Sequence, residues 1–172
     1  MAFLKFKENF LFKKYQKELQ LLATSKTPND REIHSVAILT TERLSYDLNL
    51  TEVIKEKLPS VRNVHIYSFR DYKKSDAKTY KHFTERDIDW RGNVRDSSFE
   101  SFLENPFDLL IAFFDQKHLY LEYAALQSNA AFKIGLSNIN NQLFDMVIDE
   151  KPSNLESFAK TMKKYLELLH KI

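Results

Sequence analysis

Short apolar runs alternate with amphipathic stretches along this chain. The apolar runs are rich in β-branched and aromatic residues, which is typical of strands buried on both faces of a parallel sheet. We predict strands at residues 35–41, 64–69, 107–114, 132–136 and 143–148.

The stretches between these runs carry apolar residues at three- and four-residue spacing, which predicts amphipathic helices. The predicted helices cover residues 3–24, 48–58, 97–104, 120–126 and 155–169. Alternating strands and helices predict an α/β fold, a three-layer sandwich of about five mostly parallel strands (Rossmann-like) with an extra N-terminal helix. A chain of 172 residues is long enough to bury one sizeable core, so we expect a single domain. Its segment 1–27 would pack on the domain or on a partner.

Two parts of the chain leave the arrangement open. Residues 70–95 are dense in charge and predict a long ordered excursion, with one short strand near Phe83 or Ile88. Trp90 in this segment is expected to anchor a core, since large rings need burial. The last two predicted strands lie too close in sequence for a helical crossover, so they form either a hairpin or a pair joined by an extended return.

The composition excludes several classes of protein. The chain has no cysteine, which excludes disulfides, thiolate metal sites and a thiol nucleophile and favours the cytoplasm. No segment approaches the roughly 20 apolar residues that span a bilayer, and the N-terminus does not resemble a signal peptide. With glycine only at positions 92 and 135, a glycine-rich nucleotide loop is impossible. Gly92 predicts a turn, Gly135 predicts close packing of a neighbouring element, and we predict no cofactor and no metal.

Ligands of open parallel sheets collect beyond the carboxyl ends of the strands. The polar residues that follow the predicted strands are therefore the candidate ligand-binding groups, although any α/β domain carries polar loops there for structural reasons. We single out Thr40, Thr41, Arg43 and Asn138.

One constellation has the spacing of an acid–base site. Asp115 is predicted to cap the helix after the third long apolar run, and His118 and Glu122 share a face of that helix. A carboxylate that orients an imidazole is suited to acid–base catalysis, and all three side chains could hold a metal. Acidic residues are also preferred at helix N-termini for structural reasons, and we favour that interpretation.

Two surfaces are candidates for contacts with partners. Residues 1–26 combine lysine with phenylalanine and leucine, so this helix could bind a protein partner or a second copy, with peripheral attachment to a membrane as the less favoured alternative. The segment 70–95 interleaves basic and aromatic residues as single-strand nucleic-acid sites do, but acidic residues offset most of its positive charge. We therefore expect no nucleic-acid binding.

The apolar runs also carry a resemblance to known families. Residues 107–111, 130–135 and 144–149, with the basic aromatic N-terminus and the stretch 87–92, resemble a family of uncharacterised small cytoplasmic proteins from Bacteroidetes. That resemblance implies no activity and no site residues. A fainter similarity joins residues 107–109 and 133–135 to the first half of heptosyltransferase-like glycosyltransferases, whose second nucleotide-sugar-binding domain this chain lacks.

Two functions follow as expectations. The first is a non-enzymatic binding or regulatory domain that acts through protein contacts. The second is an enzyme or sensor of a small phosphorylated or sugar-nucleotide-like ligand, bound by Thr40, Thr41, Asp115 and His118 at the carboxyl ends of the strands.

Overall fold

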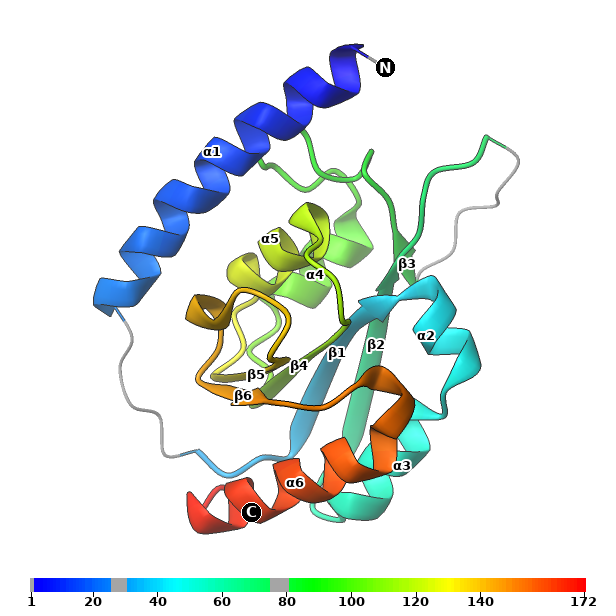
Figure 1. The fold of residues 1–172 in the computed structure, drawn as a ribbon, viewed down its shortest axis with the longest axis vertical. Coiled ribbons are helices and arrows are strands. Elements are labelled where there is room, and N and C mark those ends of the chain that lie inside the picture. The colour runs from blue at the N-terminus through cyan, green and yellow to red at the C-terminus, as the bar shows by residue number, and fades with distance from the viewer. Residues whose placement is uncertain (1, 26–30, 75–80) are drawn as a thin grey trace.

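The computed structural model describes residues 2–25, 31–74 and 81–172. Its strands are β1 (Ser35–Thr41), β2 (Asn63–Phe69), β3 (His82–Phe83), β4 (Leu109–Phe113), β5 (Phe132–Leu136) and β6 (Met146–Ile148). These strands form one sheet in the order β3-β2-β1-β4-β5-β6, and all the pairings are parallel (Figure 1).

Helices cover both faces of the sheet. The helices are α1 (Ala2–Ser25), α2 (Glu42–Asp47), α3 (Leu50–Lys57), α4 (Ser97–Glu104), α5 (Leu119–Gln127) and α6 (Leu155–Leu168), with short 3-10 helices η1 (Asn141–Leu143) and η2 (Pro152–Asn154). On one face, Tyr67 of β2 packs on Phe102 of α4, with ring centroids 4.8 Å apart. On the other face, Phe113 of β4 lies 5.1 Å from Phe158 of α6. The predicted α/β sandwich with an extra N-terminal helix is confirmed, and α1 lies outside α5 (Figure 1).

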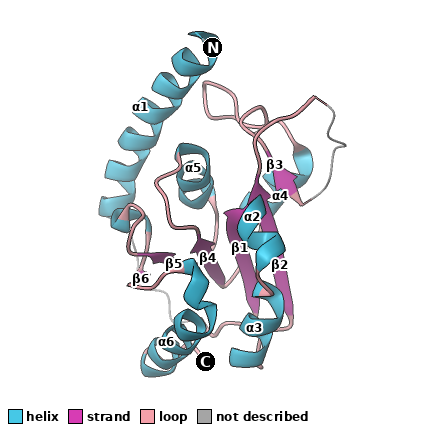
Figure 2. Cartoon of the chain, turned by 45° about the vertical axis from the view of Figure 1, so that its right-hand side comes forward, coloured by secondary structure: helices cyan, strands magenta, loops and turns pink. Residues whose placement is uncertain are grey.

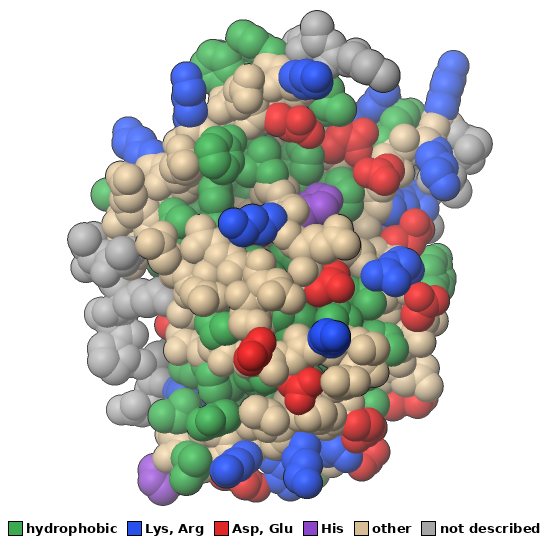
Figure 3. Space-filling view, in the orientation of Figure 1, with side chains coloured by type: hydrophobic (Ala, Val, Ile, Leu, Met, Phe, Trp, Pro, Cys, Tyr) green, Lys and Arg blue, Asp and Glu red, His purple; other side chains and the backbone are tan. Residues whose placement is uncertain are grey.

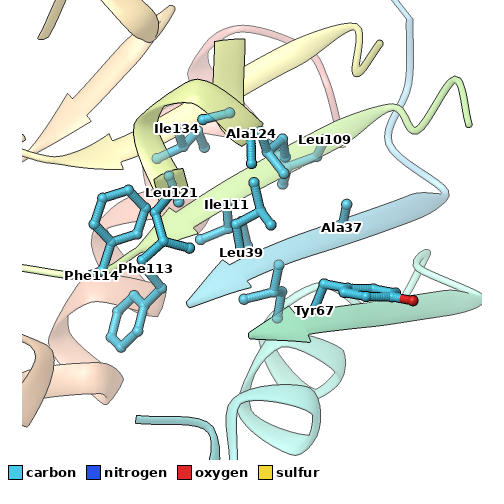
Figure 4. Close-up of a cluster of buried hydrophobic side chains, with 14 of the residues drawn as sticks. Ala37, Leu39, Tyr67, Leu109, Ile111, Phe113, Phe114, Leu121, Ala124 and Ile134 are labelled. Carbon is cyan, nitrogen blue, oxygen red and sulfur yellow. The ribbon is translucent and has the colours of Figure 1, made fainter. Parts of the chain in front are cut away.

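The core is centred on the two middle strands. Ile38 and Leu39 of β1 and Ile111 of β4 are buried, and Ile38 pairs in register with Ile111. Figure 4 shows side chains from β1, β4, β5 and α5 gathered in this cluster. Burying one such side chain stabilises the fold by about 1.5–3 kcal/mol, which explains why these strands are continuous apolar runs.

The expected elements between the strands need two corrections. Helix α2 was not predicted, because Leu44 is its only buried residue among the described positions and so no apolar period marks it. The helix predicted at residues 48–58 begins at Leu50. Of the two alternatives for the last strands, the extended return is observed: β5 and β6 are parallel, and η1 lies in the connection between them.

The charged excursion is ordered around a few buried side chains. Its predicted short strand is β3, and Ile88 forms an isolated bridge with Val94. Gly92 has φ +80° in a turn closed by a hydrogen bond from its N–H to the carbonyl of Asp89. The prediction that Trp90 anchors a core is wrong, since the side chain is 41 % exposed. Residues 75–80 of the predicted excursion, and residues 1, 26 and 27 of the predicted N-terminal segment, lie outside the described residues.

Candidate functional site

The strand order reverses between β1 and β4, so the expected ligand crevice lies beyond their carboxyl ends. Two of the predicted ligand-binding groups are used for structure there. The buried Thr40 donates from Oγ1 to the carbonyl of Phe113 at 2.7 Å. Thr41 caps α2, accepting from the N–H of Leu44 at 3.3 Å. The strand passes directly into the helix, and no loop intervenes that could enclose a phosphate.

The other two predicted ligand-binding residues lie apart. Arg43, in α2 after β1, and Asn138, after β5, are both exposed. Strand β4 separates β1 from β5 in the sheet. Whether either residue binds a ligand stays a prediction.

His118 and Glu122 are in contact, but through the backbone N–H of His118 and not through its imidazole, and the contact is that of a helix cap. The N-cap of α5 is His118, so the prediction that Asp115 caps this helix is wrong. Nδ1 of His118 accepts from the N–H of Leu121 at 3.3 Å, and the N–H of His118 donates to Oε1 of Glu122 at 3.0 Å. Burial lowers the pKa of His118, which favours the neutral imidazole that this cap requires.

Glu122 also binds the N-terminal helix. Its Oε2 accepts from Oη of Tyr15 at 2.7 Å, and Nδ2 of Asn140 donates to the same phenol at 3.1 Å. Burial and the neighbouring Glu122 raise the pKa of Tyr15. This chain of contacts ties α1 to α5 and to the loop after β5, so both carboxylate oxygens of Glu122 have partners and the residue serves the fold.

A cavity of about 650 Å³, lined by both polar and apolar side chains, lies beside these contacts, between α1 and the loops that follow β4 and β5. Phe12 and Gln16 of α1 line one side, and Lys117, His118 and Asn140 line the other. Among residues 2–25, 31–74 and 81–172, no three His, Asp or Glu side chains gather as a metal site would require. The cavity therefore offers amide, hydroxyl and ammonium groups with an exposed aromatic ring.

The outer side of α1 carries exposed rings. Phe6 (56 % exposed) and Phe10 (41 % exposed) contact each other with centroids 4.7 Å apart, and Phe10 meets Trp90 edge-on at 5.7 Å. The guanidinium of Arg91 lies over the Trp90 ring at 4.7 Å. We call Phe6, Phe10, Trp90 and Arg91 the aromatic patch. Figure 3 shows hydrophobic and lysine side chains interspersed along the part of the surface that α1 occupies.

A second cavity, of about 700 Å³, was missed by reasoning from the sequence. It runs along β2 and is lined by residues of α2, α3 and α4, among them Tyr46, Ser98 and Phe102. Its existence depends on β2 lying near the sheet edge beside a β3 of two residues. No local pattern in the sequence carries that information.

Comparisons with known proteins identify a family but no function. No helix of the described chain has the length and apolar content needed to cross a membrane. No curated protein and no solved structure matches the sequence significantly. The model of a family of unknown function, DUF6913, matches residues 7–169. The resemblance to an uncharacterised family is thereby confirmed, while the bacterial group stays a prediction, and the chain belongs to the DUF6913 family of unknown function.

Proposed function

We propose that this protein is a non-enzymatic binding domain that acts through protein contacts made by the aromatic patch. The observation that carries the proposal is the contact of Phe6, Phe10 and Trp90 at the surface, where each ring stays at least 41 % exposed. Aromatic residues and arginine are enriched at the centres of protein interfaces because they bury large areas at low entropic cost.

The residues predicted to act in catalysis or ligand binding also support a non-enzymatic role. The side-chain oxygens of Thr40, Thr41 and Glu122, and Nδ1 of His118, make hydrogen bonds to the backbone or to Tyr15. A catalytic acid or base needs a free functional group within reach of substrate. The cytoplasm remains the expected compartment, in keeping with a chain that has no cysteine.

The charges around the patch define the partner. Lys5, Lys13 and Lys17 are exposed along α1. A symmetric dimer through this face would place like charges opposite one another, which costs binding energy. We therefore propose a protein partner that offers an apolar surface with acidic residues around it.

Photo-crosslinking in the producing cells tests this proposal. Benzoyl-phenylalanine replaces Phe10 in one variant and Tyr165, another exposed aromatic residue (47 % exposed), in the control. We expect a discrete adduct with a different protein at position 10, lost when Phe6→Asp is added, and no such adduct at position 165. An adduct of two copies, or co-sedimentation with phosphatidylserine vesicles in place of an adduct, would contradict a protein partner.

The second candidate function is binding of a small sugar-like or phosphorylated ligand, and the 650 Å³ cavity beside α1 favours it. Amide groups such as that of Gln16, the Lys117 ammonium and the Phe12 ring are suited to hydroxyl and phosphate groups and to the apolar face of a sugar. A thermal-shift screen with nucleotides, sugar nucleotides and sugar phosphates tests it. A ligand at 100 times its dissociation constant adds about 2.7 kcal/mol of stability, so a rise in melting temperature that Lys117→Ala reduces would favour this function over the first.

A further inference from the structure

The edge of β2 presents backbone groups that pair with no strand of the described chain. Strand β3 pairs only with Ser68 and Phe69, whereas β1 pairs with β2 along its whole length. The N–H of Ser68 donates to the carbonyl of Lys81, and that of Arg70 to the carbonyl of Phe83. Even-numbered residues of β2 thus turn their backbone groups toward the β3 side.

The backbone groups of Val64 and Ile66 point to the same side of β2 as those of Ser68, because the backbone groups of successive residues in a strand point to opposite neighbouring strands. Within the described part of the chain, neither residue makes a backbone hydrogen bond in that direction. Figure 2 shows β3 beside only one end of β2. Beyond β3, this side of β2 is therefore a sheet edge that presents two N–H groups and two carbonyls without a partner among the described residues, a pattern that another extended backbone satisfies.

This free edge lies at the bottom of the 700 Å³ cavity described above. One wall is aromatic: Tyr67 packs on Phe102 at 4.8 Å, and His65 lies 5.3 Å from Phe107. The opposite wall comes from α2 and α3 and includes Tyr46 and Thr51. We call this cavity, with the free edge of β2, the edge groove.

We infer that the edge groove binds an extended segment of a partner protein, which adds to the sheet as a strand in line with β3. Main-chain hydrogen bonds to Val64 and Ile66 would hold the segment, and its alternate side chains would point to the two walls. The free stretch 64–67 spans about 13 Å at the usual ~3.3 Å per residue, so four or five residues of the segment make the contact.

The walls also define which segment fits. Helices on both faces recess the edge of β2, so the equally recessed edge of a second copy could not reach it, whereas a single free segment could. Of the described lining residues only Lys81 carries a permanent charge. We therefore expect apolar side chains at every second position, uncharged polar ones between them, and no net positive charge. The edge groove shares no residue with the aromatic patch. As a second protein-binding site it deepens the proposed function, and it rests on that function only in that both sites bind proteins.

Selection from a displayed library of random nine-residue peptides, followed by fluorescence anisotropy of the enriched peptides, tests the inference. Ile66→Pro removes one outward N–H without touching the ladder to β1, and proline is tolerated at such edge positions. Ile66→Val is the matched control. We expect wild type and Ile66→Val to bind within about twofold of each other, and Ile66→Pro to bind at least tenfold more weakly.

A second measurement uses the wild-type protein alone, in case Ile66→Pro does not fold. N-methylation of single peptide bonds in the best peptide should weaken binding at least tenfold at alternate positions only. Three results would overturn the inference: equal binding by a folded Ile66→Pro variant, tolerance of N-methyl groups at every position, or no enriched peptide at 0.1 mM protein, roughly the range of the weakest specific contacts. So would a dimer that Ile66→Pro dissociates. Phe10→Ala should leave the peptide affinity unchanged, so failure here is distinct from failure of the aromatic patch.

Discussion

The phenol of Tyr15 donates a hydrogen bond of 2.7 Å to Oε2 of Glu122. The two residues join α1 to α5, and Glu122 is only 6 % exposed. A buried carboxylate oxygen that loses its donor keeps its desolvation cost, so this contact holds the N-terminal helix against the domain.

Tyr15→Phe should lower the free energy of unfolding by about 1–3 kcal/mol, because Oε2 of Glu122 would then be buried without a donor. Urea denaturation followed by circular dichroism measures the change. The control is Tyr165→Phe, whose ring is 47 % exposed and whose loss of a hydroxyl should leave stability unchanged. Equal effects of the two substitutions would contradict the structural role of the contact.

The cap formed by His118 makes stability depend on pH. Burial lowers the pKa of His118 in the folded state below the ordinary value of 6.5. Above pH 6.5 both states hold a neutral ring and the contribution of His118 is fully present. As pH falls from 6.5 through the lower folded-state pKa, the unfolded chain takes up the proton first, and the free energy of unfolding decreases.

His118→Asn separates this titration from the cap, since asparagine also caps helices but does not titrate. Denaturation curves between pH 7 and pH 5 should show a shallower loss of stability in the variant than in wild type. Burial also lowers the pKa of His82, but His82 titrates in both proteins and cancels in the comparison. Parallel pH profiles would refute the assignment.

Gly135→Ala should destabilise the protein by about 1–3 kcal/mol, the usual cost of overpacking a core. A Cβ at Gly135 would overlap the ring of Phe144, and both residues are buried. Adding Phe144→Leu should recover part of that loss, because the smaller side chain leaves room for the methyl group. Thermal unfolding of the two single variants and the double variant gives the coupling, and additive effects would argue against direct contact.

Trp90 is the sole tryptophan of the chain, so its fluorescence reports on the aromatic patch. Phe10 covers one edge of the indole at a centroid distance of 5.7 Å. Phe10→Ala should increase acrylamide quenching while the free energy of unfolding falls by less than about 1 kcal/mol, because an exposed ring contributes little to stability. Quenching that stays at the wild-type level would show that the two rings are not in contact in solution.

Local pattern located most of the secondary structure. Residues 35–41 and 132–136 were predicted as strands with the bounds that β1 and β5 have. The run 107–114 was longer than β4 because Phe107 and Phe114 are buried just outside the strand. Gly135 was correctly predicted to allow close packing, and it contacts Phe144. Trp90 was wrongly assigned to a core, because the size of a ring alone does not specify what surrounds it.

The candidate site was predictable only in part. The four-residue spacing of His118 and Glu122 predicted that their side chains share a helix face, whereas the observed contact joins the backbone N–H of His118 to the Glu122 carboxylate. The use of that contact as a cap, and the binding of Glu122 by Tyr15 across 107 positions of sequence, could not be predicted. Asp115 remained outside the cap because α5 begins at Leu119.

The sequence by itself determined the fold class, the apolar strands and the amphipathic helices, because the periodicity of hydrophobic residues is set by neighbours along the chain. Tertiary structure alone decided the order of the strands, and with it the place of β2 beside a β3 of two residues. It also decided that rings of α1 and Trp90 meet at the surface. These features depend on contacts between residues far apart in the sequence, and each is selected by the packing of the whole core.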